Sequence, residues 1–264
     1  MNLVDTGAGP ALVVIPGIQG RWEYVGAAVN ALSRQFRVIT FPLCDEPSAG
    51  DAFSPAPTLD VYVDQVRQAL DDCAVERAIV CGISFGGLIA LRFAAVHASR
   101  TTGLVLASVP GPAWHLRRRH EIYARLPYVF GPLFLAEAPW RLRREMAASY
   151  PELAARWRFA RSQIRTLIKA PLSVARMGRR ARLIGRLDLA VDCDRVSAPT
   201  LVVTGERRLD HVVSVDHSNG YVSLIRGARG VVLERTGHLG SITRPEQFAA
   251  IVRDFADRRA REVA

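Results

Sequence analysis

The chain alternates short runs of β-branched residues with longer amphipathic stretches, and this alternation restricts its fold more than any other feature. It is typical of βαβ units, in which helices pack on both faces of a parallel sheet. The predicted strands are Ala11–Ile15, Arg37–Phe41, Arg77–Cys81, Gly103–Ala107, Thr200–Thr204 and Gly230–Glu234. The predicted helices are Trp22–Gln35, Leu59–Cys73, Ser84–His97, a stretch near Tyr221–Ile225, and Pro245 to about Arg261. We therefore predict an α/β fold with a mostly parallel sheet of about seven strands flanked by helices.

An arginine-rich segment punctuated by prolines interrupts this alternation. At about 150 residues per domain, the 264 residues amount to about 1.8 domains. Residues 111–190 carry 17 basic and five acidic residues, a charge of +12, whereas the remainder of the chain carries −2. Lys169 is the only lysine. We predict an α/β core formed by residues 1–110 and 191–264, with residues 111–190 as an inserted, arginine-rich helical domain.

Composition and cysteine spacing exclude several classes of protein. The apolar share of 49% and the charged share of 23% are those of a globular chain and exclude a disordered or collagen-like one. The four cysteines (Cys44, Cys73, Cys81 and Cys193) show no C-x-x-C spacing, so we expect reduced thiols and neither a metal site nor a cofactor. The first apolar run, Ala11–Ile15, is too short for a signal peptide or a membrane span, and we expect a cytoplasmic protein.

A serine between glycines follows a predicted buried strand and opens a predicted helix. The segment reads Gly82-Ile83-Ser84-Phe85-Gly86. Glycines leave room for a tight strand-to-helix turn that lifts the serine hydroxyl clear of the backbone, and the N-terminus of the helix favours developing negative charge. The pattern predicts that Ser84 is a nucleophile, provided that a base and an acid lie downstream in the chain.

The base is predicted to be His238. It directly follows the last predicted strand, within Thr236-Gly237-His238-Leu239-Gly240. The carboxyl ends of parallel strands meet at one edge of a sheet, so this position places His238 at the edge that carries Ser84. The other five histidines do not follow a strand in this way, and we interpret them as structural or surface residues.

Two carboxylates on the loop after the strand Thr200–Thr204 are candidates for the acid that orients His238. Asp210 precedes the apolar pair Val212-Val213 and stands far enough from the strand end to reach His238. Glu206 lies next to the strand end, where pairing with a neighbouring arginine is favoured. We predict Asp210, with Glu206 as the alternative.

An oxyanion hole requires two inward-facing donors near the nucleophile. The backbone N–H of Phe85, directly after Ser84, is one candidate. The turn Pro16-Gly17-Ile18-Gln19-Gly20 follows the first long strand, and the N–H of Ile18 is the second candidate. Gly17, Gly82 and Gly86 are the loop and elbow glycines that this arrangement needs.

With these residues in place, the chain resembles the α/β-hydrolase superfamily over nearly its whole length. The resemblance rests on Gly82-x-Ser84-x-Gly86, the Pro16-Gly17-x-x-Gly20 turn, the strand before Gly205, and Gly237-His238. It implies that residues 111–190 form the cap commonly inserted after the sixth canonical strand. The chain departs from the family pattern at Pro16, where a histidine is usual, and at Arg208, where the acid is usual.

The predicted function is hydrolysis of a small-molecule carboxylic ester through a Ser84–His238–Asp210 acyl-enzyme mechanism. The same three residues would also serve cleavage of a lactone, thioester, amide or C–C bond, and the motifs do not separate these reactions. A hydrolase-fold ligand-binding or sensor protein is the alternative outside enzymes. The sequence specifies no oligomeric state.

The basic residues of the insert include a helical pattern of their own. Arg158, Arg161, Arg165 and Lys169 recur on one face, and apolar residues such as Trp157 and Ile164 occupy the other. We interpret this as a solvated arginine face above an apolar roof over the active site. Weak contact with an anionic membrane surface and recognition of an anionic substrate are the alternatives. Nucleic-acid binding is not expected, because no recognised motif accompanies the arginines.

Overall fold

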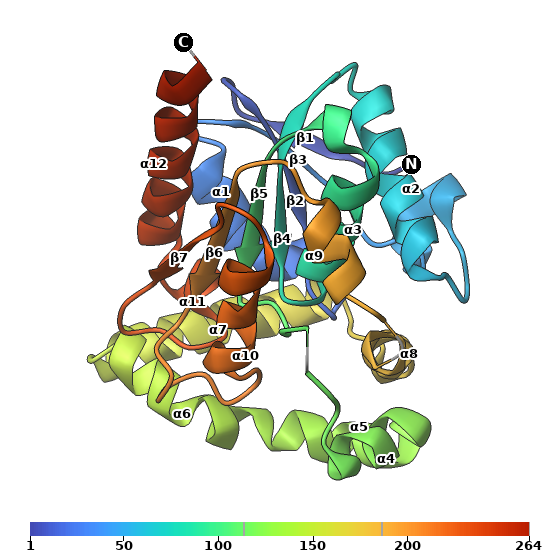
Figure 1. The fold of residues 1–264 in the computed structure, drawn as a ribbon. Coiled ribbons are helices and arrows are strands. Elements are labelled where there is room, and N and C mark those ends of the chain that lie inside the picture. Colours follow the sequence, from blue (N-terminus) through green and yellow to red (C-terminus); the bar gives the residue numbers. More distant parts are fainter. Residues whose placement is uncertain (113, 186, 264) are drawn as a thin grey trace.

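A seven-stranded sheet forms the centre of the computed structural model, which describes residues 1–112, 114–185 and 187–263 (Figure 1). The spatial order of its strands is β1-β3-β2-β4-β5-β6-β7. Only β1 runs antiparallel to its neighbour, β3, and all other neighbouring pairs are parallel. The strands are β1 (Val4–Thr6), β2 (Ala11–Ile15), β3 (Arg37–Thr40), β4 (Ala78–Ile83), β5 (Thr101–Ala107), β6 (Thr200–Thr204) and β7 (Arg229–Val232). The predicted α/β fold class is confirmed.

Helices cover both faces of the sheet and divide the core into two apolar layers. One layer holds α1 (Gly26–Leu32) and α12 (Pro245–Val263). The other holds α2 (Leu59–Asp72), α3 (Phe85–Val96), α9 (Ala190–Arg195) and α10 (Val215–Leu224). Short helical turns are η1 (Trp22–Val25), η2 (Pro47–Ala52), η3 (Ala98–Arg100) and α11 (Gly240–Thr243). Strand β4 is buried along its whole length, as expected of a parallel strand covered on both faces.

The end of β4 differs from the sequence prediction in a way that matters for the site. We predicted that this strand ends at Cys81, but it continues through Gly82 and Ile83, which pair with Leu106 and Ala107 of β5. The parallel ladder therefore extends to the residue directly before Ser84. As a result, no flexible linker separates the sheet from the serine.

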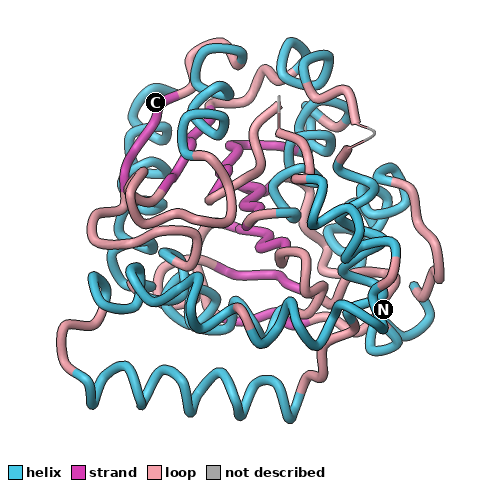
Figure 2. Tube along the Cα trace, turned by 90° about the horizontal axis from the view of Figure 1, so that it is seen from below, coloured by secondary structure: helices cyan, strands magenta, loops and turns pink. Residues whose placement is uncertain are grey.

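Of the six described helices between β5 and β6, α9 packs with the core, and the other five form what we call the helical insert: α4 (Arg118–Arg125), α5 (Pro127–Ala136), α6 (Ala138–Ser149), α7 (Leu153–Lys169) and α8 (Val174–Ile184). They lie below the sheet in Figure 1, at the end where β5 leaves it. In the view from below, α7 is the long helix along the lower margin of the molecule (Figure 2). Ala113 and Arg186, within the predicted insert, and Ala264, in the predicted core, lie outside the described residues.

The prediction for the amphipathic segment of the insert is wrong about its apolar side. The segment forms α7, but none of the residues of this fully described helix is buried. Trp157 and Ile164 are exposed to solvent instead of forming a roof, and α7 contributes no residue to the large hollow described below. Helical periodicity groups the apolar and the basic residues of α7, but it does not specify what either group packs against. No helix in the described ranges is long and apolar enough to span a bilayer.

Candidate active site

Ser84 occupies a strained turn between β4 and α3. Its backbone has φ 53° and ψ −119°, a conformation that side-chain-bearing residues rarely adopt. A Cβ on Gly82 would lie 2.3 Å from the Gly86 carbonyl oxygen, and a Cβ on Gly86 would lie 2.3 Å from the Ile15 carbonyl oxygen. Both positions therefore require glycine. The turn is held to β5 by the Ser84 N–H, which donates to the Ala107 carbonyl at 2.8 Å.

His238 reaches Ser84 from the loop that follows β7. Its Nε2 lies 3.1 Å from the Ser84 Oγ, within hydrogen-bonding distance, although the two residues are 154 positions apart in the chain. Gly237 allows this loop to lie against the loop after β6, because a Cβ there would be 2.5 Å from the Leu209 carbonyl oxygen. The sequence thus brings the histidine to the serine by placing both at the ends of parallel strands.

Asp210 stands on the other side of the imidazole. Its Oδ2 is 3.5 Å from the His238 Nδ1, an ion-pair distance that is longer than an ordinary hydrogen bond. Its Oδ1 accepts the N–H groups of Val212 and Val213 at 2.9 Å each, which fixes the carboxylate. The alternative acid, Glu206, instead accepts the backbone N–H of Arg235 at 2.6 Å. The structure therefore places Asp210 beside the histidine. Glu206 instead holds the start of the loop at residues 233–239 that carries His238, which we call the histidine loop.

The electrostatics of Asp210 and His238 favour the charged form of each group within a largely buried site. Burial opposes ionisation of Asp210, but His238 and the two backbone N–H groups outweigh it and lower the pKa of the carboxyl below 3.8. Burial likewise lowers the pKa of His238, yet the neighbouring carboxylates of Asp210 and Glu145 raise it above 6.5 overall. The histidine therefore holds a proton more tightly than a free imidazole does.

The turn after β2 packs directly against Ser84. The Gly20 N–H donates to the Gly17 carbonyl at 2.9 Å and closes the turn. A Cβ on Gly17 would lie 3.4 Å from the Cβ of Ser84, so the turn and the serine are in contact. Phe85 is the first residue of α3, where backbone N–H groups have no acceptor within the helix. The two residues predicted to donate to an oxyanion, Ile18 and Phe85, thus come from segments that flank the serine.

A buried arginine that the sequence analysis did not single out holds this turn in place. Arg180, on α8, is 1% exposed. Its guanidinium donates to Asp45 at 2.5 Å, to Glu46 at 2.6 Å and to the carbonyl of Ile18 at 2.8 Å. Burial disfavours the charged form, but the two carboxylates outweigh it and raise the pKa of Arg180. The helical insert is therefore anchored to the turn at residues 16–20 through the backbone carbonyl of Ile18.

A buried glutamate from the insert contacts the histidine loop, and the sequence analysis missed it as well. Glu145, on α6, is fully buried, and its Oε1 accepts the N–H of Leu239, next to His238, at 2.8 Å. Burial raises the pKa of Glu145, although backbone N–H groups of Gly237 and Leu239 oppose the rise. One turn later, the Ser149 hydroxyl donates to the Arg235 carbonyl at 2.9 Å. Helix α6 is thus bound to both ends of the histidine loop.

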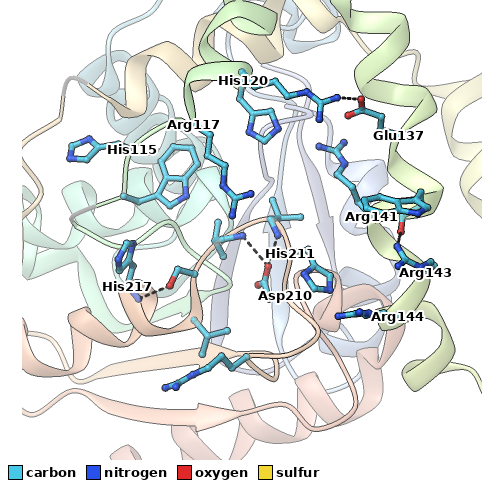
Figure 3. A pocket seen from close by; sticks show the side chains of 18 residues that line it. His115, Arg117, His120, Glu137, Arg141, Arg143, Arg144, Asp210, His211 and His217 are labelled. Atoms are coloured by element: carbon cyan, nitrogen blue, oxygen red, sulfur yellow. Dashed lines mark hydrogen bonds and ion pairs between the residues drawn. The ribbon is translucent and has the colours of Figure 1, made fainter.

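A hollow of about 720 Å³, which we call the arginine hollow, opens between the insert and the loop that carries Asp210 (Figure 3). Figure 3 shows Arg117 and His120 facing Arg141 across it. Its charged and titratable lining residues are Arg117, Arg119, Arg141, Arg143, Arg144, Arg207, His115, His120, His211, His217, Glu137 and Asp210. Cations therefore greatly outnumber carboxylates around this space.

The arginines of the hollow differ in what they contact. Arg119 pairs with Glu137, and Arg207 pairs with Asp216 outside the hollow. Arg141 and Arg143 stack on aromatic rings. Two further lining arginines, Arg117 and Arg144, have no carboxylate partner among the residues that the structure describes. Burial lowers the pKa of His120, and the neighbouring arginines lower it further.

The chemistry that this arrangement can perform is proton transfer and nucleophilic attack. The Ser84 Oγ lies beside the His238 imidazole, and Asp210 lies on its other side, so these residues can serve as a nucleophile, a base and an acid that orients the base. Within the described ranges, no group of three or more His, Cys, Asp or Glu side chains is arranged to hold a metal ion. A parallel sheet with a strained serine between strand and helix, and a histidine from the last strand's loop, defines the class of α/β-fold hydrolases.

Comparison with known proteins agrees with that class. A family model described as the alpha/beta hydrolase family matches residues 12–251, and the chain belongs to this family. The "Putative carbamate hydrolase RutD" of Escherichia coli is 25% identical over 256 residues, which cover 92% of this chain and 90% of that protein.

Solved structures extend the likeness of the fold over nearly the whole chain. The enol-lactonase of Burkholderia xenovorans shares 22% identity with a TM-score of 0.75, over 97% of this chain and 96% of that one. A thermophilic esterase of Thermogutta terrifontis shares 22% identity with a TM-score of 0.76, over 98% and 93% of the two chains. These neighbours share the sheet and its flanking helices, and their titles name different reactions.

Proposed function

We propose that the protein is a serine hydrolase that cleaves carboxylic esters through an acyl-enzyme intermediate. The observation that carries the proposal is the strained Ser84, with its Oγ 3.1 Å from the Nε2 of His238. Backbone strain of this kind persists only where the surrounding structure enforces it, and it is concentrated at functional sites. A serine exposed by such a turn beside a histidine is the arrangement that nucleophilic catalysis requires.

In the proposed mechanism, His238 is the general base and Asp210 fixes its tautomer. With the Nδ1 proton directed at Asp210, the Nε2 lone pair accepts the hydroxyl proton of Ser84. The Ser84 Oγ attacks the ester carbonyl carbon, and the N–H groups of Ile18 and Phe85 stabilise the oxyanion. His238 then gives its proton to the leaving alkoxide. Water, deprotonated by His238, attacks the acyl carbon; the bond from that carbon to the Ser84 Oγ then breaks, the acid leaves, and His238 returns its proton to Oγ.

Other acyl substrates would use the same residues. Lactone, thioester, amide and C–C bond cleavage all pass through a serine-bound oxyanion, and the names of the relatives include a carbamate hydrolase and an enol-lactonase. The alternative outside enzymes is a ligand-binding or sensor protein that retains the three residues.

The test is labelling and turnover with a matched control serine. A fluorophosphonate probe should label the wild type and the variant Ser108→Ala, but not Ser84→Ala. Ser108 is a good control because it also follows a strand and has a positive φ of 49°. With 4-nitrophenyl acetate, Ser84→Ala should lower kcat at least about 10³-fold, whereas Ser108→Ala should stay within a few-fold of wild type. Full activity of Ser84→Ala would overturn the mechanism, and labelling without turnover of any acyl ester would favour the binding protein.

The arginine hollow favours a narrower substrate class, namely esters that carry a carboxylate or phosphate group. Arg117 and Arg144 line it without carboxylate partners among the described residues, and Asp210 belongs to both the hollow and the proposed triad. Guanidinium groups bind such anions through paired, charge-assisted hydrogen bonds. An anionic group held in the hollow would lie beside Asp210, whereas Ser84 and His238 do not themselves line the hollow.

A comparison of two esters of similar size, one anionic and one neutral, distinguishes a preference for anionic substrates from ester hydrolysis itself. The ratio of kcat/KM for 4-nitrophenyl hemisuccinate to that for 4-nitrophenyl pentanoate should fall about tenfold in the variant R117Q/R144Q. The control R161Q/R165Q removes two exposed arginines that do not line the hollow and should leave the ratio unchanged. An unchanged ratio in R117Q/R144Q would remove the anionic preference and leave ester hydrolysis intact.

A further inference from the structure

Helix α7 exposes a continuous apolar stripe to solvent. Leu153, Trp157, Ile164 and Ile168 are 68%, 71%, 57% and 75% exposed. At 3.6 residues per turn, these four positions fall within an arc of about 60° on one side of the helix. Single exposed apolar residues are ordinary, but an aligned stripe with a tryptophan at its centre marks an interaction surface.

Cations run directly beside this stripe. Continuing around the helix, the next charged positions are Arg161, Arg165, Arg158 and Lys169, all exposed and interrupted only by Ala154. Helix α7 contains no acidic residue. None of these four side chains pairs with a carboxylate elsewhere among the described residues. The solvent-facing half of the helix is therefore one apolar strip and one cationic strip, side by side.

The rest of the insert reinforces this composition. Of the 19 large hydrophobic side chains that are exposed among the described residues, 12 lie between residues 122 and 168. Tyr128, Val129 and Trp140 are among the most exposed of them. Tyrosine and tryptophan favour the boundary between water and lipid, because one end of each ring system is apolar and the other is polar. The exposed apolar surface thus coincides with the part of the chain that carries a charge of +12.

The positive charge beside the apolar stripe determines which kind of partner surface the stripe can contact. A second copy of the chain would bring another α7, with its own cations and no carboxylate, against the first, and like charges would repel. An anionic bilayer surface attracts the cations and accepts the apolar side chains at its acyl boundary. No described helix could cross the bilayer, so α7 would lie in the plane of its surface.

We propose that α7 binds the protein to the surface of membranes that contain anionic phospholipids. Trp157, Ile164 and Ile168 enter the boundary between headgroups and acyl chains, while Arg158, Arg161 and Arg165 contact lipid phosphates. The contact is peripheral and sensitive to salt, because much of the attraction is electrostatic. It is independent of ester hydrolysis, so Ser84→Ala should bind vesicles as well as the wild type does.

Co-sedimentation with large unilamellar vesicles tests the proposal. We expect the wild type to pellet with phosphatidylcholine vesicles that contain 30% phosphatidylglycerol, and pelleting to fall sharply with pure phosphatidylcholine or at high salt. Each basic side chain near an anionic surface contributes about a fivefold change in partitioning, so R161Q/R165Q should weaken binding at least about tenfold. W157S/I164S/I168S should weaken it similarly or more, because it removes the apolar anchor.

Matched variants on the core serve as controls. R226Q/R258Q removes two exposed arginines outside the insert, and V96S/L224S removes two exposed apolar side chains outside it. Both should bind vesicles like the wild type. All variants change exposed side chains, and unaltered melting temperature and 4-nitrophenyl acetate turnover would show that they are folded.

Three results would overturn the proposal. One is equal pelleting with anionic and neutral vesicles, and another is equal binding of the α7 variants and their controls. The third is a dimer, measured by light scattering without lipid, that W157S/I164S/I168S converts to a monomer. That result would assign the stripe to a second copy of the chain instead of a bilayer.

Discussion

Helices α7 and α8 are neighbours in the chain, and both are rich in arginine, yet they place that residue in opposite environments. Arg180 of α8 is buried against Asp45, Glu46 and the carbonyl of Ile18. Arg161 and Arg165 of α7 are exposed, and no carboxylate among the described residues pairs with them. The same side chain is thus a structural anchor in one helix and a solvent-facing charge in the next.

This difference shows that the charge of the insert has two separable parts. A buried, fully paired guanidinium fixes the insert to the core, because breaking such a pair leaves buried carboxylates without compensation. Exposed arginines contribute little to folding and remain available for partners. Substitution of Arg180 in α8 should therefore change the free energy of unfolding, whereas substitution of the exposed arginines of α7 should change the binding of partners.

The largest effect on stability is expected from Arg180→Met. It leaves Asp45 buried without a cationic partner and Glu46 with Arg176 alone, and it should lower the free energy of unfolding by about 3–5 kcal/mol. Urea denaturation monitored by circular dichroism measures this loss. Arg179→Met is the control, since Arg179 is exposed and adjacent in sequence, and it should cost less than about 0.5 kcal/mol. Equal stability of the two variants would contradict the anchoring role of Arg180.

Gly20→Ala should have the next largest effect on stability, because its added methyl group disturbs the same Arg180 contacts from the core side. Gly20 has φ +75°, and a Cβ there would lie 2.3 Å from the guanidinium of Arg180. We expect a loss of about 2–3 kcal/mol in the free energy of unfolding, from backbone strain and displacement of the arginine together. Gly227→Ala isolates the strain, because Gly227 has φ +74° and nothing within 4 Å of the added Cβ. If the two variants lost equal stability, the contact with Arg180 would contribute nothing.

A smaller, pH-dependent effect is expected from Glu145→Gln. The carboxylates of Asp210 and Glu145 raise the pKa of His238, and the proposed base works only when it is unprotonated, so activity falls as pH drops through that pKa. Removing the charge of Glu145 should lower the pKa of His238 and move the acid limb of kcat/KM to lower pH.

The pH profile of 4-nitrophenyl acetate hydrolysis measures this shift. Glu152→Gln, which changes an exposed glutamate of the insert, should leave the profile in place. A uniform loss of activity in Glu145→Gln at every pH, with an unmoved acid limb, would restrict Glu145 to holding the histidine loop.

The smallest effect on stability is expected from R158Q/R161Q/R165Q. Because these side chains are exposed and unpaired with described carboxylates, the free energy of unfolding should change by less than about 0.5 kcal/mol. The same urea titration as for Arg180→Met gives a direct comparison. A loss above about 1 kcal/mol would mean that α7 relies on its arginines for folding, as α8 does.

The sheet and the serine position were predictable because their signals are local. Glycine spacing around Ser84 and the strand before it lie within one short segment, and the same holds for Gly237 and His238. The choice between Asp210 and Glu206 depended on the path of a single loop, which the apolar pair Val212-Val213 indicated. Each of these residues belongs to the α/β core, where strand ends determine position.

The contributions of the insert to the site could not be predicted in the same way. Arg180 contacts Ile18 across 162 positions of the chain, and Glu145 contacts Leu239 across 94. In sequence both look like ordinary residues of charged helices, because helical periodicity specifies a face but not the surface that it meets. The wrong expectation for α7 has the same cause.

The position of Lys169 gives α7 a chemical handle. It is the only lysine in the chain, it is exposed, and it is the last residue of the helix. Arginine does not react with the esters that acylate amines, so such a reagent would modify this side chain and the amino terminus and leave the other 34 basic residues untouched. A dye or spin label at Lys169 would therefore report the surroundings of α7 without any engineered cysteine.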